Sequence, residues 1–423
     1  EDEIFVGVLH TNSCNVYVAP QEGHQFVLSL EDVVANEERG GGSLATVDFQ
    51  RLDGVSGIFV ANKRMARRGQ DATTADVVTL ITYDNGGEWT KLRAPAASAC
   101  VLPECSLNLG MESLQLPKGY QFDLLFTSTS APGFVLANGN AGTALSFSPK
   151  GVYSTDAGVT WAFEPSGLPR EFVSVDHGGV LVGATPYSRN SQPVDSVVYS
   201  VDEGETWQTF KFSSTAINVV RMLTEHWETS TIVSLWGYAS IGGSLKWHII
   251  SIDFASVLGE PCGDSDYTTW SPRDINSPVG CLLGQQQIFE RRKADSVCLN
   301  GRNYDRAVSA KSCPCYADDF ECDVGFAHVE DDQNVCMPVG DPSDYVDVCR
   351  YPGQNVTISR GYRRISGNRC SGGLEAVFEP FSLTCKDPCP TTEWTEWSTC
   401  NLCTDRISTR SRTPLADLPS DFC

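Results

Sequence analysis

Positive charge is scarce in this chain. Its 423 residues contain 31 lysines and arginines against 53 aspartates and glutamates, and the formal net charge is −22. A phosphate backbone is bound by clustered cations, so the composition excludes nucleic acid as a partner. The acidic residues are spread along the chain, which favours a solvated, repulsive surface over a surface that attracts basic ligands.

Long apolar runs are also missing. No stretch of roughly 18 apolar residues could cross a membrane, and the chain has no initiating methionine and no signal peptide. Membrane attachment is therefore expected only through segments absent from this chain.

Catalytic and metal-binding patterns are absent as well. The six histidines have no metal-ligand spacing, and no nucleophile elbow, phosphate-binding loop or sialidase-like set of arginines with a Tyr/Glu pair is found. The histidines are His10, His24, His177, His226, His248 and His328. We therefore expect no enzyme activity, no cofactor and no resident metal.

Cysteine is rare in the first 258 residues and dense afterwards. Only Cys14, Cys100 and Cys105 precede residue 258, whereas 14 of the 17 cysteines follow it. Such density indicates disulfides, which persist in the secretory lumen or outside the cell. Because secretion needs a leader that this sequence lacks, we expect a piece of a longer precursor.

A repeat organises the first 258 residues. Three segments, TYDNGGEW, STDAGVTW and SVDEGETW, read Ser/Thr-x-Asp-x-Gly-x-x-Trp, and a degenerate copy, APQEGHQF, spans residues 19–26. The hydroxyl and carboxylate can accept backbone N–H bonds, glycine supplies positive φ, and tryptophan packs on the sheet. The pattern predicts Asp-box hairpin turns at Thr82, Asp84, Gly86 and Trp89, at Ser154, Asp156, Gly158 and Trp161, and at Ser200, Asp202, Gly204 and Trp207.

Apolar, β-branched segments flank each turn. GIFVANK, GFVLANG and GGVLVGA lie upstream of the three full boxes, and TIVSLWGYAS with WHIISIDF suggests a further unit without a box. An inner strand followed by an outer hairpin is one propeller blade. The prediction is a mainly β chain with about five propeller blades, followed by small disulfide-rich modules.

The region after the blades resembles the ten-cysteine module of sortilin-family receptors. The resemblance rests on EPCGDSDYTTWSP, CLLGQQQIFERRKADSVCLNGRNY, CPCYADDFECDVGFAH and GYRRISGNRCSGG, and it extends back through the blades. The ten matching cysteines are Cys262, Cys281, Cys298, Cys313, Cys315, Cys322, Cys336, Cys349, Cys370 and Cys385. The implied domains are blades over 1–258 and the module over 259–386.

In that family a ten-bladed ring encloses a tunnel that binds peptides and proteins. The resemblance therefore implies that this chain supplies the C-terminal half of the ring. It also implies that Cys14 pairs in the missing half, and Cys100 and Cys105 can close a local loop. Some relatives place a basic ligand-binding residue where this chain has Ser56, so Lys63 and Arg64 are the alternative tunnel contacts.

Residues 387–423 resemble the opening of a thrombospondin type 1 repeat. The stretch WTEWSTCNLC is followed by arginines, and Trp394 and Trp397 would stack with Arg410 and Arg412. CNLC replaces the usual longer cysteine run, so a fucosylation signal is missing, while Trp394 could carry a C-linked mannose.

Four further motifs have plain alternatives. Asn355 begins a glycosylation sequon, Asn-Val-Thr, and predicts an exposed edge. His177 could titrate on acidification, but a surface histidine is the simpler interpretation. The acidic run 318–323 lacks the ligand spacing of a calcium loop, and the basic run 63–68 is interpreted as an exposed loop.

Two functions follow from these patterns. The first is a non-catalytic lumenal or extracellular receptor ectodomain that captures peptide or protein ligands for sorting or surface recognition. The alternative is a structural or adhesive assembly component that self-associates or binds extracellular matrix through a thrombospondin-like stalk. Both place the protein in the secretory pathway, at the cell surface or outside the cell.

Overall fold

A computed structural model describes residues 3–10, 13–20, 26–36, 46–65, 76–111, 125–146, 148–187, 191–225, 227–273, 280–304, 309–329, 332–339, 354–384 and 395–396. The chain forms two compact units, Glu1–Cys315 with Ile365–Gly372, and Tyr316–Arg364 with Gly373–Cys423. The predicted domain boundary after residue 258 falls inside the first unit and stays a prediction.

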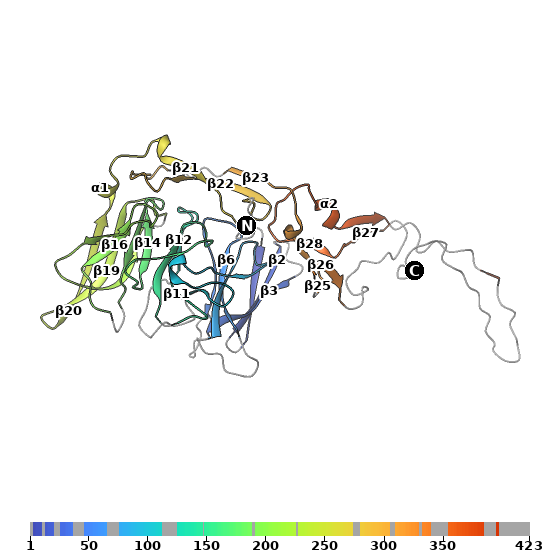
Figure 1. The fold of residues 1–423 in the computed structure, drawn as a ribbon, viewed down its shortest axis with the longest axis horizontal. Coiled ribbons are helices and arrows are strands. Elements are labelled where there is room, and N and C mark those ends of the chain that lie inside the picture. The colour runs from blue at the N-terminus through green and yellow to red at the C-terminus, as the bar shows by residue number, and fades with distance from the viewer. Residues whose placement is uncertain are drawn as a thin grey trace. The chain divides into compact units, whose positions relative to one another are not determined.

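Antiparallel sheets make up most of the first unit, which confirms the predicted mainly β class (Figure 1). The first sheet has the order β1-β2-β3-β6-β7-β8, with β4 on β3 and β5 on β6. Its strands are β1 (Glu3–Leu9), β2 (Ser13–Pro20), β3 (Val27–Asn36), β4 (Thr46–Val47), β5 (Phe49–Arg51), β6 (Phe59–Arg64), β7 (Val77–Thr82) and β8 (Thr90–Lys91).

Three more sheets follow in chain order. The second contains β9 (Ser106–Leu109), β10 (Leu125–Thr127), β11 (Val135–Gly142), β12 (Lys150–Ser154) and β13 (Ala162–Phe163). The third contains β14 (Glu171–Val175), β15 (Val180–Ala184), β16 (Ser196–Ser200) and β17 (Gln208–Lys211). The fourth contains β18 (Asn218–Leu223), β19 (Ile232–Ile241) and β20 (Ser244–Asp253), where the unit without a box was predicted.

The central strands of these sheets are rich in β-branched and apolar residues, which suits strands that are buried on both faces. All five residues of β14 and of β15 are buried. One buried cluster includes Ile81, Leu107, Val135 and Val152 of the first two sheets, and burial of this kind is the main source of stability.

The three predicted boxes share one turn geometry, each joining the last two strands of its sheet. In the third turn the Ser200 hydroxyl donates to the Asp202 carboxylate at 2.7 Å and accepts the Gly204 N–H at 2.8 Å. Thr82 and Ser154 make the equivalent bonds to their own aspartates and glycines. The aspartates are thus engaged within their turns; the degenerate copy lies largely outside the described residues.

Two sheet faces at the ends of this series carry exposed apolar side chains. On β1, Val6 and Val8 are 40% and 43% exposed. On β20, Leu245, Trp247 and Ile249 share one face and are at least 60% exposed. Large exposed apolar faces of this kind are normally covered by another element.

The rest of the first unit is a short, disulfide-linked segment. It contains α1 (Ala255–Leu258), β21 (Tyr267–Trp270), β22 (Gln285–Arg292) and β23 (Ser309–Ser312), with a 3-10 turn at Asp264–Asp266. Another 3-10 turn, Ala96–Ser98, lies between β8 and β9. Disulfides Cys262–Cys298, Cys281–Cys313 and Cys315–Cys370 hold it.

The second unit is built from two-stranded sheets around a small core. Its elements are β24 (Phe320–Cys322), β25 (Phe326–Val329), β26 (Asp332–Pro338), β27 (Asn355–Ile358), β28 (Tyr362–Arg364), α2 (Glu375–Phe378) and β29 (Phe381–Thr384), with a 3-10 turn at Ala317–Asp319. Cys322–Cys336 crosslinks it. Across both units, none of the helices in the described ranges has the length and apolarity to span a bilayer.

Candidate functional site

An extensive contact in the described part of the first unit joins the sheets to residues 262–273 and 280–304, here called the arm. The arm includes β21 and β22, which run past the ends of the sheets in Figure 1. It contacts the turns that precede β6, β11 and β15 in three successive sheets, at Gly57, at Gly133, and at Asp176 with Gly179. We call this contact the seam.

Glycines give the arm room to approach the sheets. Gly57 has a φ of +81°, and a β-carbon there would lie 2.3 Å from the Leu283 side chain. Gly133 has a φ of +86°, and a β-carbon would lie 2.6 Å from the Trp270 ring. Positive φ and close packing both favour glycine, so Gly57 and Gly133 serve the seam, whereas Gly178, in the third turn, packs against Ala131 and Phe134.

Arg291 anchors the middle of the seam. Its guanidinium lies 4.3 Å from the Phe134 ring centre, donates to the Thr155 carbonyl at 2.7 Å and pairs with Glu203 at 2.7 Å. Burial lowers the pKa of Arg291, and the Glu203 carboxylate opposes that shift. The arginine thereby links two sheets and the arm.

Arg292, the next residue, connects the arm to the third sheet. It donates to the carbonyls of Gly179 at 2.7 Å, Val201 at 2.5 Å and Cys298 at 2.8 Å. Burial lowers its pKa, and the charge of Asp176 opposes that shift most strongly. The buried guanidinium of Arg292 thus donates hydrogen bonds to carbonyls in two turns of the third sheet and in the arm.

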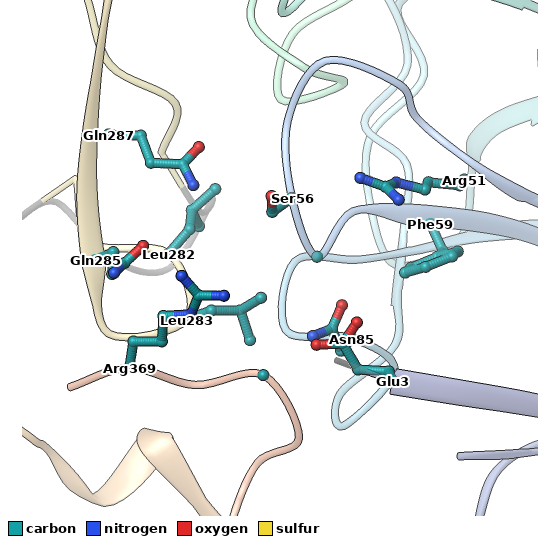
Figure 2. A pocket seen from close by; sticks show the side chains of 12 residues that line it. Glu3, Arg51, Ser56, Phe59, Asn85, Leu282, Leu283, Gln285, Gln287 and Arg369 are labelled. Carbon is teal, nitrogen blue, oxygen red and sulfur yellow. The ribbon is translucent and has the colours of Figure 1, made fainter. Parts of the chain in front are cut away.

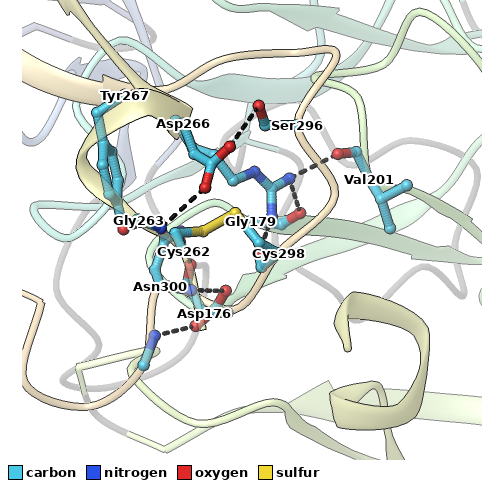
Figure 3. Close-up of a disulfide and its surroundings, with 12 residues drawn as sticks. Asp176, Gly179, Val201, Cys262, Gly263, Asp266, Tyr267, Ser296, Cys298 and Asn300 are labelled. Atoms are coloured by element: carbon cyan, nitrogen blue, oxygen red, sulfur yellow. Dashed lines mark hydrogen bonds between the residues drawn. A yellow bond between two sulfur atoms is a disulfide. The ribbon is translucent and has the colours of Figure 1, made fainter. Parts of the chain in front are cut away.

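Asp176 makes the complementary contact from the sheet side (Figure 3). Its carboxylate accepts the backbone N–H groups of Asn300 at 2.9 Å and Gly301 at 2.8 Å, next to the Cys262–Cys298 disulfide. The side chain is fully buried, and burial raises the pKa of Asp176, although these two bonds and Arg292 oppose the rise.

His177 belongs to the same contact. It is 7% exposed, its Nε2 lies 3.1 Å from the Gly301 carbonyl, and its ring packs edge-on against Tyr304. The interpretation of His177 as a surface histidine is therefore wrong, because the arm covers the turn that carries it.

Replacing Asp176 with asparagine is expected to cost about 1–3 kcal/mol at neutral pH, because an amide NH₂ would face a backbone N–H. The pKa of Asp176 is higher in the folded protein than in the unfolded chain. Protonation of Asp176 therefore adds to the free energy of unfolding at low pH, and this contribution is lost as the pH rises through the pKa of the folded state. The stability gap between wild type and variant should therefore widen on acidification.

Urea unfolding of both proteins from neutral pH to about pH 4 measures this gap. Carboxylates with lowered pKa values, such as Asp202 and Asp253, destabilise both proteins equally in acid and cancel in the comparison. If the difference in free energy of unfolding between the two proteins stays constant or narrows on acidification, the pKa of Asp176 is not raised in the folded state.

A small cavity lies at the start of the seam (Figure 2). Ser56, Arg51 and Asn85 face Gln285, Gln287 and Arg369 across about 100 Å³. Ligand pockets usually measure roughly 300–1,000 Å³, so this one suits a few waters or a side-chain tip better than a peptide.

The three predicted ligand contacts are not brought together. Ser56 lines the seam cavity, whereas Lys63 and Arg64 lie at the far end of β6, a strand of six residues or roughly 20 Å. Lys63 pairs with Val33 of the neighbouring strand, and both basic side chains are partly exposed. Of these three residues, only Lys63 and Arg64 carry a positive charge.

The described cysteines of the module are all disulfide-bonded, and Cys100 bonds to Cys105. Cys349 and Cys385 lie outside the described residues, as do Trp394, Trp397, Arg410 and Arg412. Cys14 is a buried thiol whose pKa is raised by burial. Within the described ranges no cluster of three or more His, Cys, Asp or Glu could hold a metal.

Comparison with known proteins relates both halves of the chain to one family. The family model described as "Sortilin, neurotensin receptor 3" matches residues 1–222, and its C-terminal counterpart matches residues 224–385. The Sortilin-related receptor of Mus musculus is 34% identical over 421 residues, covering 94% of this chain and 18% of the relative. The Homo sapiens VPS10 domain-containing receptor SorCS2 is 31% identical, covering 91% of this chain and 33% of the relative. The chain thus spans a third or less of these relatives.

Proposed function

Because this chain belongs to the sortilin family, we propose that it is part of a non-catalytic receptor ectodomain that binds peptide or protein ligands. The observation that carries the proposal is the pair of consecutive family matches over residues 1–222 and 224–385. The relatives are named as receptors. The carboxylates of the three box aspartates are hydrogen-bonded within their own turns.

The sheets form part of a larger ring in this proposal. The apolar faces on β1 and β20 support it, since each is a sheet face of the kind that a neighbouring blade covers. The ligand-binding residues are placed at the end of β6 that carries Lys63 and Arg64, with the protein working in the secretory pathway or at the cell surface.

A structural or adhesive role is the second candidate. It is favoured by one feature, the thrombospondin-like sequence of residues 387–423 with its WTEW motif. Repeats of that kind form stalks, and a scaffold would self-associate or bind matrix instead of releasing cargo.

Capture of secretory peptides tests the receptor proposal. The complete ectodomain that contains this chain is immobilised, loaded with peptides at pH 7.4 and washed at pH 5.5, and the released peptides are identified by mass spectrometry. We expect specific peptides to be retained at the first pH and released at the second.

Two variants locate the binding site. Changing Lys63 and Arg64 together to alanine should reduce peptide retention, whereas Lys246→Ala, on exposed β20, should not. If the double variant retains peptides as well as the wild type does, the binding site lies elsewhere on the ectodomain. An ectodomain that retains no peptide and polymerises with concentration would instead support the scaffold.

A further inference from the structure

The sheet of β27 and β29 in the second unit has two chemically different faces. Opposed residues of an antiparallel pair share a face, and the pairing sets Asn355 against Thr384 and Thr357 against Ser382. These four polar residues form one face, and all four are exposed. On the opposite face Val356 is 2% exposed and lies across from Leu383.

The orientation of the Asn355 amide is set by its neighbour. The Thr384 hydroxyl donates to the Asn355 carbonyl oxygen at 2.8 Å. Since the oxygen of the amide is turned to β29, the amide nitrogen is the atom left for the exposed side of the face.

Strand alternation also places the second recognition element of the sequon correctly. Thr357 follows Asn355 by two residues and therefore lies on the same exposed face, while Val356 between them points into the core. Asn355-Val356-Thr357 is the one Asn-x-Ser/Thr sequence in the 423 residues. A single glycan is thus the most that this motif allows on the chain.

We propose that Asn355 carries an N-linked glycan that extends from this polar face into solvent. The donor is a lipid diphosphate-linked oligosaccharide. Its anomeric carbon breaks its bond to the diphosphate oxygen and bonds to Asn355 Nδ2, and one amide proton leaves with the lipid diphosphate. The carbonyl oxygen is unchanged, so the bond from Thr384 persists beside the glycan.

The glycan assigns a role to each face of the sheet. It covers Asn355, Thr357, Ser382 and Thr384, so this face stays solvated and no partner docks on it. Any protein contact made by this sheet must use the side of Phe381 and Leu383, which are 40% and 44% exposed. The proposal rests on the proposed function only through passage along the secretory pathway, which both candidate functions require.

The test uses the full-length precursor, secreted by cultured eukaryotic cells and digested with N-glycosidase in heavy-oxygen water. Conversion of residue 355 to an ¹⁸O-labelled aspartate in the peptide spectrum marks an occupied site. We expect labelling in wild type, in Thr357→Ser and in Thr384→Val, which keeps the sequon but removes the bond to the amide. Asn355→Gln and Thr357→Ala should show none.

The possible failures are distinguishable. A secreted protein whose residue 355 is unlabelled overturns the glycan proposal and leaves the receptor proposal standing. A precursor that never enters the secretory pathway overturns both. Loss of labelling in Thr384→Val would overturn the claim that glycosylation depends on the sequon and exposure alone.

Discussion

Arg292→Ala is expected to destabilise the first unit by about 3–5 kcal/mol, because removing one partner of a buried charge network leaves the rest uncompensated. The variant removes the donor to three carbonyls, those of Gly179, Val201 and Cys298. Asp176 would also lose the cation that opposes the rise in its pKa. A buried carboxylate and three carbonyls are therefore affected together.

Chemical unfolding of the secreted, disulfide-intact chain measures the effect, and hydrogen exchange localises it. Exchange should accelerate first at the Asn300 and Gly301 amides, which donate to Asp176. Arg302→Ala is the matched control, since Arg302 is exposed and lies in the same arm. Equal stability of the two variants would show that the seam does not hold the arm.

Gly284→Ala is expected to cost on the order of 3 kcal/mol or to block secretion. Gly284 has a φ of +66°, and a β-carbon would lie 2.1 Å from the Cys370 backbone nitrogen. That backbone cannot move freely, because Cys370 is bonded to Cys315 and the Gly284 carbonyl accepts the Cys313 N–H at 2.8 Å. Strain and steric overlap therefore act together.

Gly242→Ala separates the two causes. Gly242 has a similar φ of +61°, but a β-carbon added at this hairpin tip would have no atom within 4 Å. Its loss of stability should be only about 1–2 kcal/mol, the cost of left-handed backbone for a residue with a side chain. Thermal unfolding of both variants compares them. Equal losses would mean that overlap with Cys370 contributes nothing.

Local chemistry explains which features were predictable. The turns at Thr82, Ser154 and Ser200 were foreseen because hydroxyl, carboxylate and glycine act within five residues of each other. The mainly β class followed from β-branched segments beside those turns. Asn355 was foreseen as exposed, and it is exposed.

The seam was not foreseen because its parts are distant in sequence. Arg292 and Gly179 are 113 residues apart, and Asn300 and Asp176 are 124 apart. A signal was present, however: two adjacent arginines end the strand QQQIFERR, and both are buried. Buried arginines need several acceptors, which here come from other sheets.

The ligand contacts show a different limit. Ser56, Lys63 and Arg64 are close in sequence, but an extended strand carries them to opposite ends of a sheet. Ser56 consequently faces the arm, and its seam cavity is about 100 Å³. Their proximity in sequence indicated a single site, but the extended strand separates Ser56 from Lys63 and Arg64.

Isothermal titration calorimetry of the complete ectodomain with a captured secretory peptide, at pH 7.4 and pH 5.5, tests the receptor proposal most directly. We expect saturable binding at pH 7.4, weakened when Lys63 and Arg64 are changed to alanine, and loss of binding at pH 5.5. No saturable binding at either pH, with concentration-dependent polymerisation in sedimentation, would contradict it.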